Sequence, residues 1–491
     1  MTDQEKGNTS PSPPSISTIS STPSLSFILT AFTKHQKIYI TVLASIASFF
    51  SPFSANCYFP AMKLIESDLQ IDSNKMYSTI TVFMLFQGIS PSVWSYWADH
   101  RGRRPVYLYN LFLYMLSNIG LALASNYSML LGFRILQAFG SSSIIAIGSG
   151  TIADITTPEE RGGYQGWYAL GFTLAPAVAP MIGGLISRYL GWRWIFWLLS
   201  LTCCVHWVIL YFTLPETLMC DQPKPCRGSD AKIPAWGRWW SVLSGQKLGQ
   251  ERSSEDTLQE ASYQPEKKIV KVPMTCAQYR DVLVLVFFGS FQYAALYTVI
   301  TLQPAILRGE GYNLDAWSIG LTYLSMGFGF ILGSILQGYT LNKDYMRFGM
   351  GPDPNLEYAR LRWVWLHAIL FNIILVLYGW VAAWQHHLAF LLIGQFLCKF
   401  HSIFNALGTL LIDLFPTRSA SIQACNTVFR CFFGAFATGT IDPLVNALGY
   451  GWSYTLISGI LLLSRVLLVF ELKYGAVWRK QRELEEIPIR V

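Results

Sequence analysis

Uncharged stretches long enough to cross a lipid bilayer recur along most of this chain. They cover residues 38–62, 76–98, 105–133, 135–153, 162–187, 194–215, 282–307, 316–342 and 363–398. A membrane-spanning helix needs about 20 consecutive, mostly apolar residues, so the last stretch is long enough for two helices, with a break at His386-His387. Residues 400–470 hold the end of the tenth helix and two more. The pattern predicts an all-α membrane protein with twelve transmembrane helices.

The composition supports this interpretation, because 52% of the residues are hydrophobic and only 13% are charged. A soluble domain has about 25% charged residues. The net charge of +7 is explained by the rule that basic residues collect on the cytosolic side. With the N-terminus in the cytosol, few basic residues remain outside: Lys63, Lys75, Arg188, Arg193 and Arg308. Both termini are therefore expected in the cytosol. The chain has no basic soluble domain of the kind that binds nucleic acid.

Two segments of the chain resemble each other at a separation of about 260 residues. Asp154 and its following Pro158 match Asp413 and Pro416, and a Gly-Trp pair at 191–192 matches one at 451–452. Two parallel repeats of six helices place a site at their interface, near the middle of the bilayer. The expected division is an N-terminal tail, a first six-helix half, a cytosolic linker, a pseudo-symmetric second half and a C-terminal tail: 1–37, 38–214, 215–280, 281–472 and 473–491.

Arg134 lies in a stretch that is otherwise apolar or small. A charge at the centre of a membrane costs from about 3 to more than 10 kcal/mol, and such a residue normally faces a protein-lined, wet cavity. The arginine therefore predicts a polar pathway through the helices.

Residues 95–105 resemble the cytoplasmic loop signature of the major facilitator superfamily. The resemblance is carried by Asp99, Gly102, Arg103 and Arg104, although Ser95 stands where the signature has Gly. His100 replaces the usual basic residue after the aspartate. The resemblance implies a gating loop that latches the two halves by ion pairs when the cytoplasmic side is closed.

Two further motifs follow in order. Arg134, Gln137 and Gly140 resemble the fourth-helix motif of proton-coupled members, in which the arginine serves proton transfer or substrate binding. The alternative is a structural arginine that bonds nearby carbonyls.

Residues 171–184 resemble the fifth-helix motif of drug:proton antiporters, with Ala179 in place of a glycine. Small residues let helices approach closely and prolines bend them, so a simple packing kink is the alternative. This motif contains Gly171, Pro176, Pro180, Gly183 and Gly184.

Together these motifs resemble the twelve-spanner drug:proton antiporter family, and residues 55–60, 342–345 and 428–443 are similar to its fungal branch. That branch contains quinidine-resistance-type exporters of drugs and polyamines, and also exporters of citrate- or itaconate-like acids. The resemblance implies export, with the plasma membrane as the default location for this branch and the vacuole as the alternative. No nucleotide-binding motif or catalytic triad is present, so we expect a transporter driven by an ion gradient and no enzymatic activity.

The charges within the predicted helices favour an anionic substrate. Arg134, Lys399, Arg430 and Arg465 are basic, whereas Asp442 is the single acidic residue inside a predicted span. Arginine binds carboxylates through paired hydrogen bonds. If Lys399 and Arg465 instead extend toward water, a multidrug or polyamine:proton antiporter remains the alternative. A sensor that does not transport is a third hypothesis.

The sequence therefore predicts a proton-coupled exporter of a small organic anion, acting as a monomer in the lipid bilayer. The nine cysteines show no metal-binding spacing, and neither a metal nor a cofactor is expected. The residues expected along the path of substrate and protons are Arg134, Gln137, Lys399, His401, Arg430 and Asp442.

Overall fold

The computed structural model describes residues 32–156, 158–217, 279–309, 311–349, 356–385, 387–414 and 419–486. Most of the predicted linker, nearly all of the N-terminal tail and His386 lie outside these ranges. Every regular element in the described part is helical. The elements are α2 (Lys34–Cys57), η1 (Phe59–Ala61), α3 (Met62–Leu69), α4 (Ser73–Arg101), α5 (Arg103–Ala122), α6 (Tyr127–Ser141), α7 (Ser143–Ile155), α8 (Pro158–Tyr189), α9 (Arg193–Thr213), α12 (Arg280–Arg308), α13 (Ala316–Asp344), η4 (Tyr345–Gly349), α14 (Leu356–Leu361), α15 (Val364–Trp384), α16 (Leu388–Phe400), α17 (Phe404–Leu414) and α18 (Ser419–Glu486).

These helices account for the twelve predicted crossings. By length and composition, eight helical stretches of the described residues are able to cross a membrane. Gly449 interrupts α18 with a φ of 75°, so this element makes two crossings. The helices α6 and α7 together make the fourth crossing, and α16 and α17 together make the tenth. The predicted all-α fold is confirmed.

The boundary between the third and fourth crossings lies inside the uncharged stretch 105–133, because α5 ends at Ala122 and α6 begins at Tyr127. The side chain of Asn126 accepts a hydrogen bond from the backbone N–H of Met129 at 2.9 Å. An asparagine at this position caps a helix start, so it marks the boundary even though no charged residue is present.

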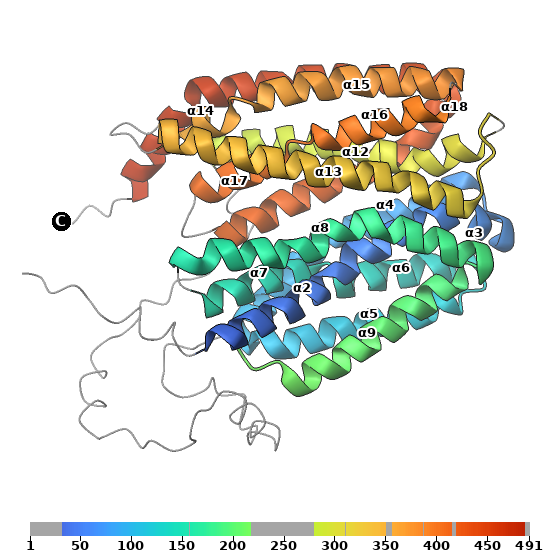
Figure 1. Cartoon of the computed structure of the whole chain (residues 1–491), viewed down its shortest axis with the longest axis horizontal. Coiled ribbons are helices and arrows are strands. Elements are labelled where there is room, and N and C mark those ends of the chain that lie inside the picture. The colour runs from blue at the N-terminus through green and yellow to red at the C-terminus, as the bar shows by residue number, and fades with distance from the viewer. Residues whose placement is uncertain are drawn as a thin grey trace, which may run out of the picture.

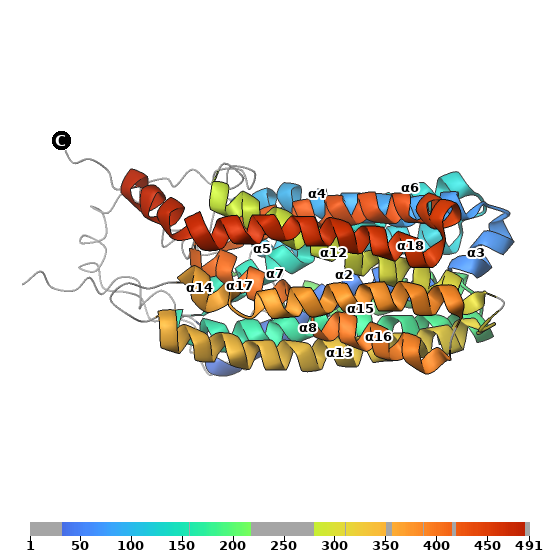
Figure 2. The same cartoon turned by 90° about the horizontal axis from the view of Figure 1, so that it is seen from above.

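The helices form two groups that lie side by side (Figure 1). Helices α2–α9 make the first half and α12–α18 make the second half. In the view from above, α18 runs nearly the full length of the bundle (Figure 2). The end where α2 begins and α18 ends is called the terminal end below, and the opposite end is called the distal end.

The two halves repeat the same ion pair at the terminal end. In the first half, Nε of Arg103 lies 3.0 Å from a carboxylate oxygen of Asp154. In the second half, Nε of Arg360 lies 2.8 Å from Asp413. Asp154 and Asp413 are the residues that the sequence repeat had aligned. The fourth and tenth crossings also break at matching places, at Ser142 and at residues 401–403.

Contacts between the halves lie toward the distal end. A Cβ atom added to Gly184 of α8 would lie 2.4 Å from the carbonyl oxygen of Ala316 in α13. The hydroxyl groups of Thr81 in α4 and Thr438 in α18 share a hydrogen bond of 3.2 Å. Arg188 also forms an ion pair with Asp315 across the two halves. The halves are therefore closed against each other at this end.

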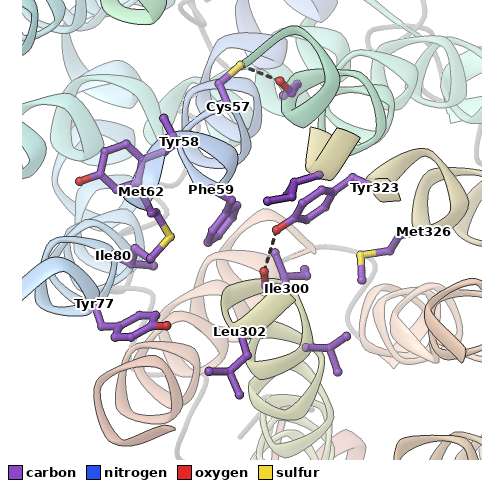
Figure 3. Close-up of a cluster of buried hydrophobic side chains, with 14 of the residues drawn as sticks. Cys57, Tyr58, Phe59, Met62, Tyr77, Ile80, Ile300, Leu302, Tyr323 and Met326 are labelled. Atoms are coloured by element: carbon purple, nitrogen blue, oxygen red, sulfur yellow. Dashed lines mark hydrogen bonds between the residues drawn. The ribbon is translucent and has the colours of Figure 1, made fainter. Parts of the chain in front are cut away.

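Buried aromatic side chains fill the interface between the halves on the distal side. Phe59 of the first half stacks on Tyr323 of the second, with ring centroids 6.3 Å apart. The hydroxyl of Tyr323 donates to the carbonyl oxygen of Ile300 at 2.9 Å (Figure 3). Phe59 and Tyr323 are 2% and 1% exposed. This packing excludes water between the halves on the distal side of the candidate site.

Candidate functional site

Arg134 is held in a chain of buried polar side chains. It is 1% exposed, and its Nη1 donates to Oε1 of Gln137 at 2.8 Å. Gln137 in turn donates to Oδ1 of Asn118 in α5, also at 2.8 Å, and Asn118 donates to the carbonyl oxygen of Tyr114 at 2.7 Å. Arg134 and Gln137 are one turn apart on α6 and so lie on the same face. The sequence had named both residues, and the structure joins them.

Aromatic rings surround the guanidinium group of Arg134. Its central carbon lies 3.4 Å from the ring centroid of Tyr58 and 5.1 Å from that of Phe83. Such cation–π contacts favour a buried cation. The hydroxyl of Tyr58 shares a hydrogen bond of 2.9 Å with Thr79, which fixes the ring. Tyr58 lies in the segment 55–60 that resembles the fungal branch, but neither Tyr58 nor Thr79 was predicted as a site residue.

No carboxylate pairs with Arg134 among the ion pairs of the described residues. Its Nε atom is buried and has no hydrogen-bond partner in this part of the chain. A buried donor without a partner costs about 1–3 kcal/mol, and more when the group is charged. The site therefore favours a ligand that brings a negative charge and an acceptor.

Arg134 lines a small cavity of about 10 Å³, which is roughly the space of one water molecule. Both halves contribute to the wall. Gln87 is one of the lining residues, and its Oε1 is also buried without a partner among the described residues. The lining residues are Ala55, Phe59, Ile80, Phe83, Met84, Gln87, Arg134 and Tyr297.

Arg430 and Lys399 form a second basic cluster in the second half. Tyr297, which lines the cavity, contacts this cluster through Tyr293. Tyr297 packs on Tyr293 with ring centroids 4.5 Å apart, and the guanidinium carbon of Arg430 lies 4.8 Å from the Tyr293 centroid. Lys399 is close enough to Arg430 for the two positive charges to repel each other, and its Nζ lies 5.6 Å from the Phe330 ring. The cavity wall at Tyr297 thus connects the Arg134 site to a region with two more cations.

The other two predicted pathway residues lie elsewhere. His401 contacts His367, with 2.9 Å between their Nδ1 atoms. Asp442 lies on α18, distal to Thr438, where it accepts a hydrogen bond from Asn446 at 3.3 Å. The structure thus does not gather all six predicted residues at one point, and the roles of His401 and Asp442 stay predictions.

The second half contains a neutral counterpart of the Arg134 site. Gln395 of α16, which like Arg134 of α6 is the eighth residue of its helix, is fully buried. Its Oε1 accepts a hydrogen bond from Gln303 at 3.2 Å, and Gln303 also donates to Thr322 at 2.6 Å. The bond between Gln303 and Thr322 resembles the bond between Tyr58 and Thr79 in the first half. Sequence reasoning missed these residues, although Gln303 and Gln395 are polar residues inside apolar stretches and give a usable signal.

The contacts described for the loop between α4 and α5 lie within the first half. Besides the Arg103–Asp154 ion pair, the backbone N–H groups of Arg103 and Arg104 donate to the two carboxylate oxygens of Glu216, at 2.7 and 3.2 Å. Gly102 has a φ of 102°, and a Cβ there would lie 2.4 Å from Glu216. Glycine is therefore required at this position.

The side chain of Asp99, named as part of this gating loop, lies outside the described residues. The contacts of Arg103 and Arg104 given above do not reach the second half. The latch between the halves therefore stays a prediction.

The glycines of α8 are sites of close helix contact. A Cβ on Gly171 would lie 2.2 Å from the carbonyl oxygen of Ser45, and one on Gly183 would lie 2.3 Å from that of Cys57. Both contacts are with α2, whereas Gly184 contacts α13 of the second half. The thiol of Cys57 also donates to the carbonyl oxygen of Ala179 at 3.0 Å (Figure 3).

Two prolines lie inside α8 near these contacts, Pro176 and Pro180. Each removes one backbone donor from the helix. A Cβ on Gly320 of α13 would lie 2.4 Å from the carbonyl oxygen of Pro180. This helix therefore joins the halves through backbone contact that larger side chains would prevent.

Comparisons with known proteins agree with this arrangement. Residues 44–438 match the family described as the Major Facilitator Superfamily. This chain belongs to the major facilitator superfamily. Among solved members of similar fold is the xylose transporter XylE from E. coli, in a partially occluded inward-open conformation. Its TM-score is 0.64 at 15% sequence identity, covering 89% of this chain and 97% of that one.

Similar superfamily proteins include fungal transporters. Citrate exporter 1 from Aspergillus niger is 34% identical, over 98% of this chain and 93% of that protein. A multidrug transporter from Candida glabrata is 28% identical, over 91% of this chain and 78% of its own length. The similarity covers both halves and the site between them.

Proposed function

We propose that this protein exports a small organic anion, such as a di- or tricarboxylate, by proton-coupled secondary active transport. The observation that carries this proposal is Arg134, a fully buried cation that lines the cavity between the halves. No ion pair in the described residues satisfies it. A substrate carboxylate supplies the missing negative charge.

The geometry of Arg134 suits a carboxylate. Gln137 holds Nη1, and Nε has no protein partner among the described residues. A carboxylate that accepts from Nε and from the neighbouring amino group forms the paired arrangement that makes arginine a selective ligand. Arg430 and Lys399, on the other side of Tyr293 and Tyr297, provide positive charge for a second carboxylate.

The similarity to a citrate exporter supports this substrate class. Citrate carries three carboxylates, and a substrate of this kind needs more than one cationic contact. The arrangement of one arginine in the first half and two cations in the second half meets that need. A substrate that binds both halves also provides the energy to bring them together.

Alternating access follows from the contacts between the halves. They are joined at the distal end by Arg188–Asp315 and Thr81–Thr438. Rocking the halves would break these contacts and close the terminal end around the substrate. We place the terminal end in the cytosol, because the predicted cytosolic loops hold most of the basic residues. The proposed location is the plasma membrane, and the proposed working unit is a monomer.

The alternative substrate class is a cationic or neutral drug, or a polyamine. The aromatic cavity wall favours it, since Phe59, Phe83 and Tyr297 offer ring faces to a flat or cationic ligand. The similarity to a multidrug transporter supports this alternative substrate class. The three cations near the cavity argue against a cationic substrate.

The test is a flux assay with the full chain in proteoliposomes loaded with labelled citrate, itaconate, spermidine or quinidine. We expect efflux of citrate or itaconate above that of empty liposomes, and a change of rate when a pH gradient is imposed. Efflux of quinidine or spermidine with none of either acid would replace the anion proposal by the multidrug one.

A further inference from the structure

Gln87 lines the same cavity as Arg134 but takes no part in the hydrogen bonds described above for that arginine. Its Oε1 is a buried acceptor with no partner among the described residues. We propose that Gln87 recognises a hydroxyl group carried next to a carboxylate, so that the substrates are hydroxy acids. The inference rests on the proposed export of organic anions and narrows the substrate class of that same site.

The spacing of residues along α4 explains why Gln87 faces the cavity. Four lining residues of this helix recur at intervals of three and four positions, so they share one face of the helix. The first three are apolar, and the fourth, a glutamine, lies nearest the terminal end. They are Ile80, Phe83, Met84 and Gln87.

The helix turn that carries Gln87 also lies against the second half. A Cβ atom added to Gly88, the next residue of α4, would lie 3.0 Å from the Cβ of Cys431 in α18. Cys431 directly follows Arg430 in the chain. The close contact of the two helices therefore brings the turn of α4 that carries Gln87 near the segment of α18 that belongs to the second basic cluster.

Arg134 and Gln87 each have a buried polar atom without a partner in the described part of the chain, and the two atoms need opposite partners. Nε of Arg134 is a donor with positive charge, whereas Oε1 of Gln87 is an acceptor. Tyr297, the other polar lining residue, packs on Tyr293. A ligand that satisfies both residues must offer an acceptor to the arginine and a donor to the glutamine.

A hydroxyl group fits the donor that Gln87 needs. A carboxyl group beside Arg134 is kept ionised by the positive charge, so it has no proton to donate. An ammonium donor would place a second cation next to the arginine and be repelled by it. A hydroxyl group is uncharged, and the cavity of about 10 Å³ is roughly the space of one water molecule, which a hydroxyl oxygen also fills.

The small size of the cavity sets the arrangement of groups in the ligand. Because Arg134 and Gln87 line one cavity of this size, the carboxylate and the hydroxyl group that they bind must lie on the same carbon atom or on adjacent ones. Citrate and malate have this arrangement. Tricarballylate and succinate have the same carboxylates without the hydroxyl group, so they provide matched analogues.

The test measures binding of these two pairs of acids to the purified full chain in detergent, by calorimetry. Wild-type protein is compared with Gln87→Met, which keeps the length of the side chain but removes its polar atoms. Gln423→Met is the control. Gln423 of α18 does not line the cavity, and its Nε2 donates to the carbonyl oxygen of Gly408 at 3.0 Å.

We expect wild-type protein and the control to bind citrate about five- to fiftyfold more tightly than tricarballylate, because the analogue leaves a buried acceptor without a partner. Malate should be favoured over succinate by a similar factor. In Gln87→Met both ratios should fall to about twofold or less, through weaker binding of the hydroxy acids alone.

Equal Kd values for citrate and tricarballylate on wild-type protein would overturn the inference, since a water molecule would then fill the place of the hydroxyl group. This comparison does not depend on the folding of any variant. A wild-type ratio in Gln87→Met, or an equal loss of all four acids in a monodisperse Gln87→Met protein, would overturn it as well.

These outcomes leave the proposed export of anions intact, because wild-type protein still binds the acids. Wild-type protein that binds none of the four acids would refute the proposed function itself, and the hydroxyl inference with it.

Discussion

The guanidinium group of Arg134 lies 3.4 Å from the centre of the Tyr58 ring. The arginine comes from α6 and the tyrosine follows α2, so this contact joins two crossings of the first half. Gln137 holds one edge of the guanidinium and the ring covers a face. The Nε donor stays available for a ligand.

Replacing Arg134 tests the anion site directly. A charge-assisted bond to a carboxylate contributes about 1.5–3 kcal/mol. Arg134→Ala should therefore raise the citrate Kd by about ten- to a hundredfold, and Arg134→Lys should restore it only in part, because lysine lacks the paired donors. Binding to purified protein is the measurement, with Arg193→Ala at the distal surface as the control. An unchanged Kd in Arg134→Ala would refute the site.

Tyr58 should act through its ring more than through its hydroxyl. Tyr58→Phe removes the bond to Thr79 but keeps the ring beneath Arg134, so citrate affinity should change by less than about threefold. Tyr58→Leu removes the cation–π contact and should weaken binding about five- to thirtyfold. Equal effects of the two variants, measured by the same binding assay, would show that the hydroxyl is the important group.

The second basic cluster distinguishes the two substrate classes. Arg430→Ala and Lys399→Ala should each lower citrate flux in proteoliposomes, since each removes positive charge from the second half. Flux of a cationic drug should not fall. The opposite pattern, efficient export of quinidine that improves when these charges are removed, would favour the multidrug alternative.

Close helix contact at Gly183 and Gly184 should be essential. Leucine at either position would place its Cβ within 2.4 Å of a backbone carbonyl oxygen and force the helices apart. Gly183→Leu and Gly184→Leu should abolish flux at near-normal protein abundance. Gly163→Leu on the same helix is the matched control, because nothing lies within 4 Å of its added Cβ. Normal flux from both variants would mean that close contact here is dispensable.

The gating loop gives a prediction for the terminal end. Arg103→Ala removes the ion pair with Asp154, and citrate flux should fall at least about tenfold while abundance stays near normal. The side chains of Arg103 and Asp154 are only 12% and 22% exposed, so the thermal stability of the purified variant is measured beside its flux, and a loss of flux at unchanged stability is the expected result. Arg360→Ala, the repeat-related change, should have a similar effect. Wild-type flux in both variants would exclude a gating role.

Sequence reasoning predicted the fold well because lipid imposes a simple rule on helix length and charge. The pattern of charges alone does not mark the turn at residues 123–126, where Asn126 starts α6 without any charged residue. Sequence reasoning found Gln137 beside Arg134, since a spacing of three residues on one helix fixes that neighbour. Tyr58 and Thr79 come from other helices, and only the packed structure brings them to the arginine. The same holds for His367 and His401, which are far apart in the chain.

The contrast between the neutral Gln395 and the charged Arg134 bears on how the cargo of this scaffold could change. One half holds a buried cation in a frame of hydrogen bonds, and the other half holds a neutral amide in a comparable frame. Gln303 and Thr322 complete the second frame. A descendant could therefore change its cargo by exchanging one side chain within a ready-made frame, without rebuilding the scaffold.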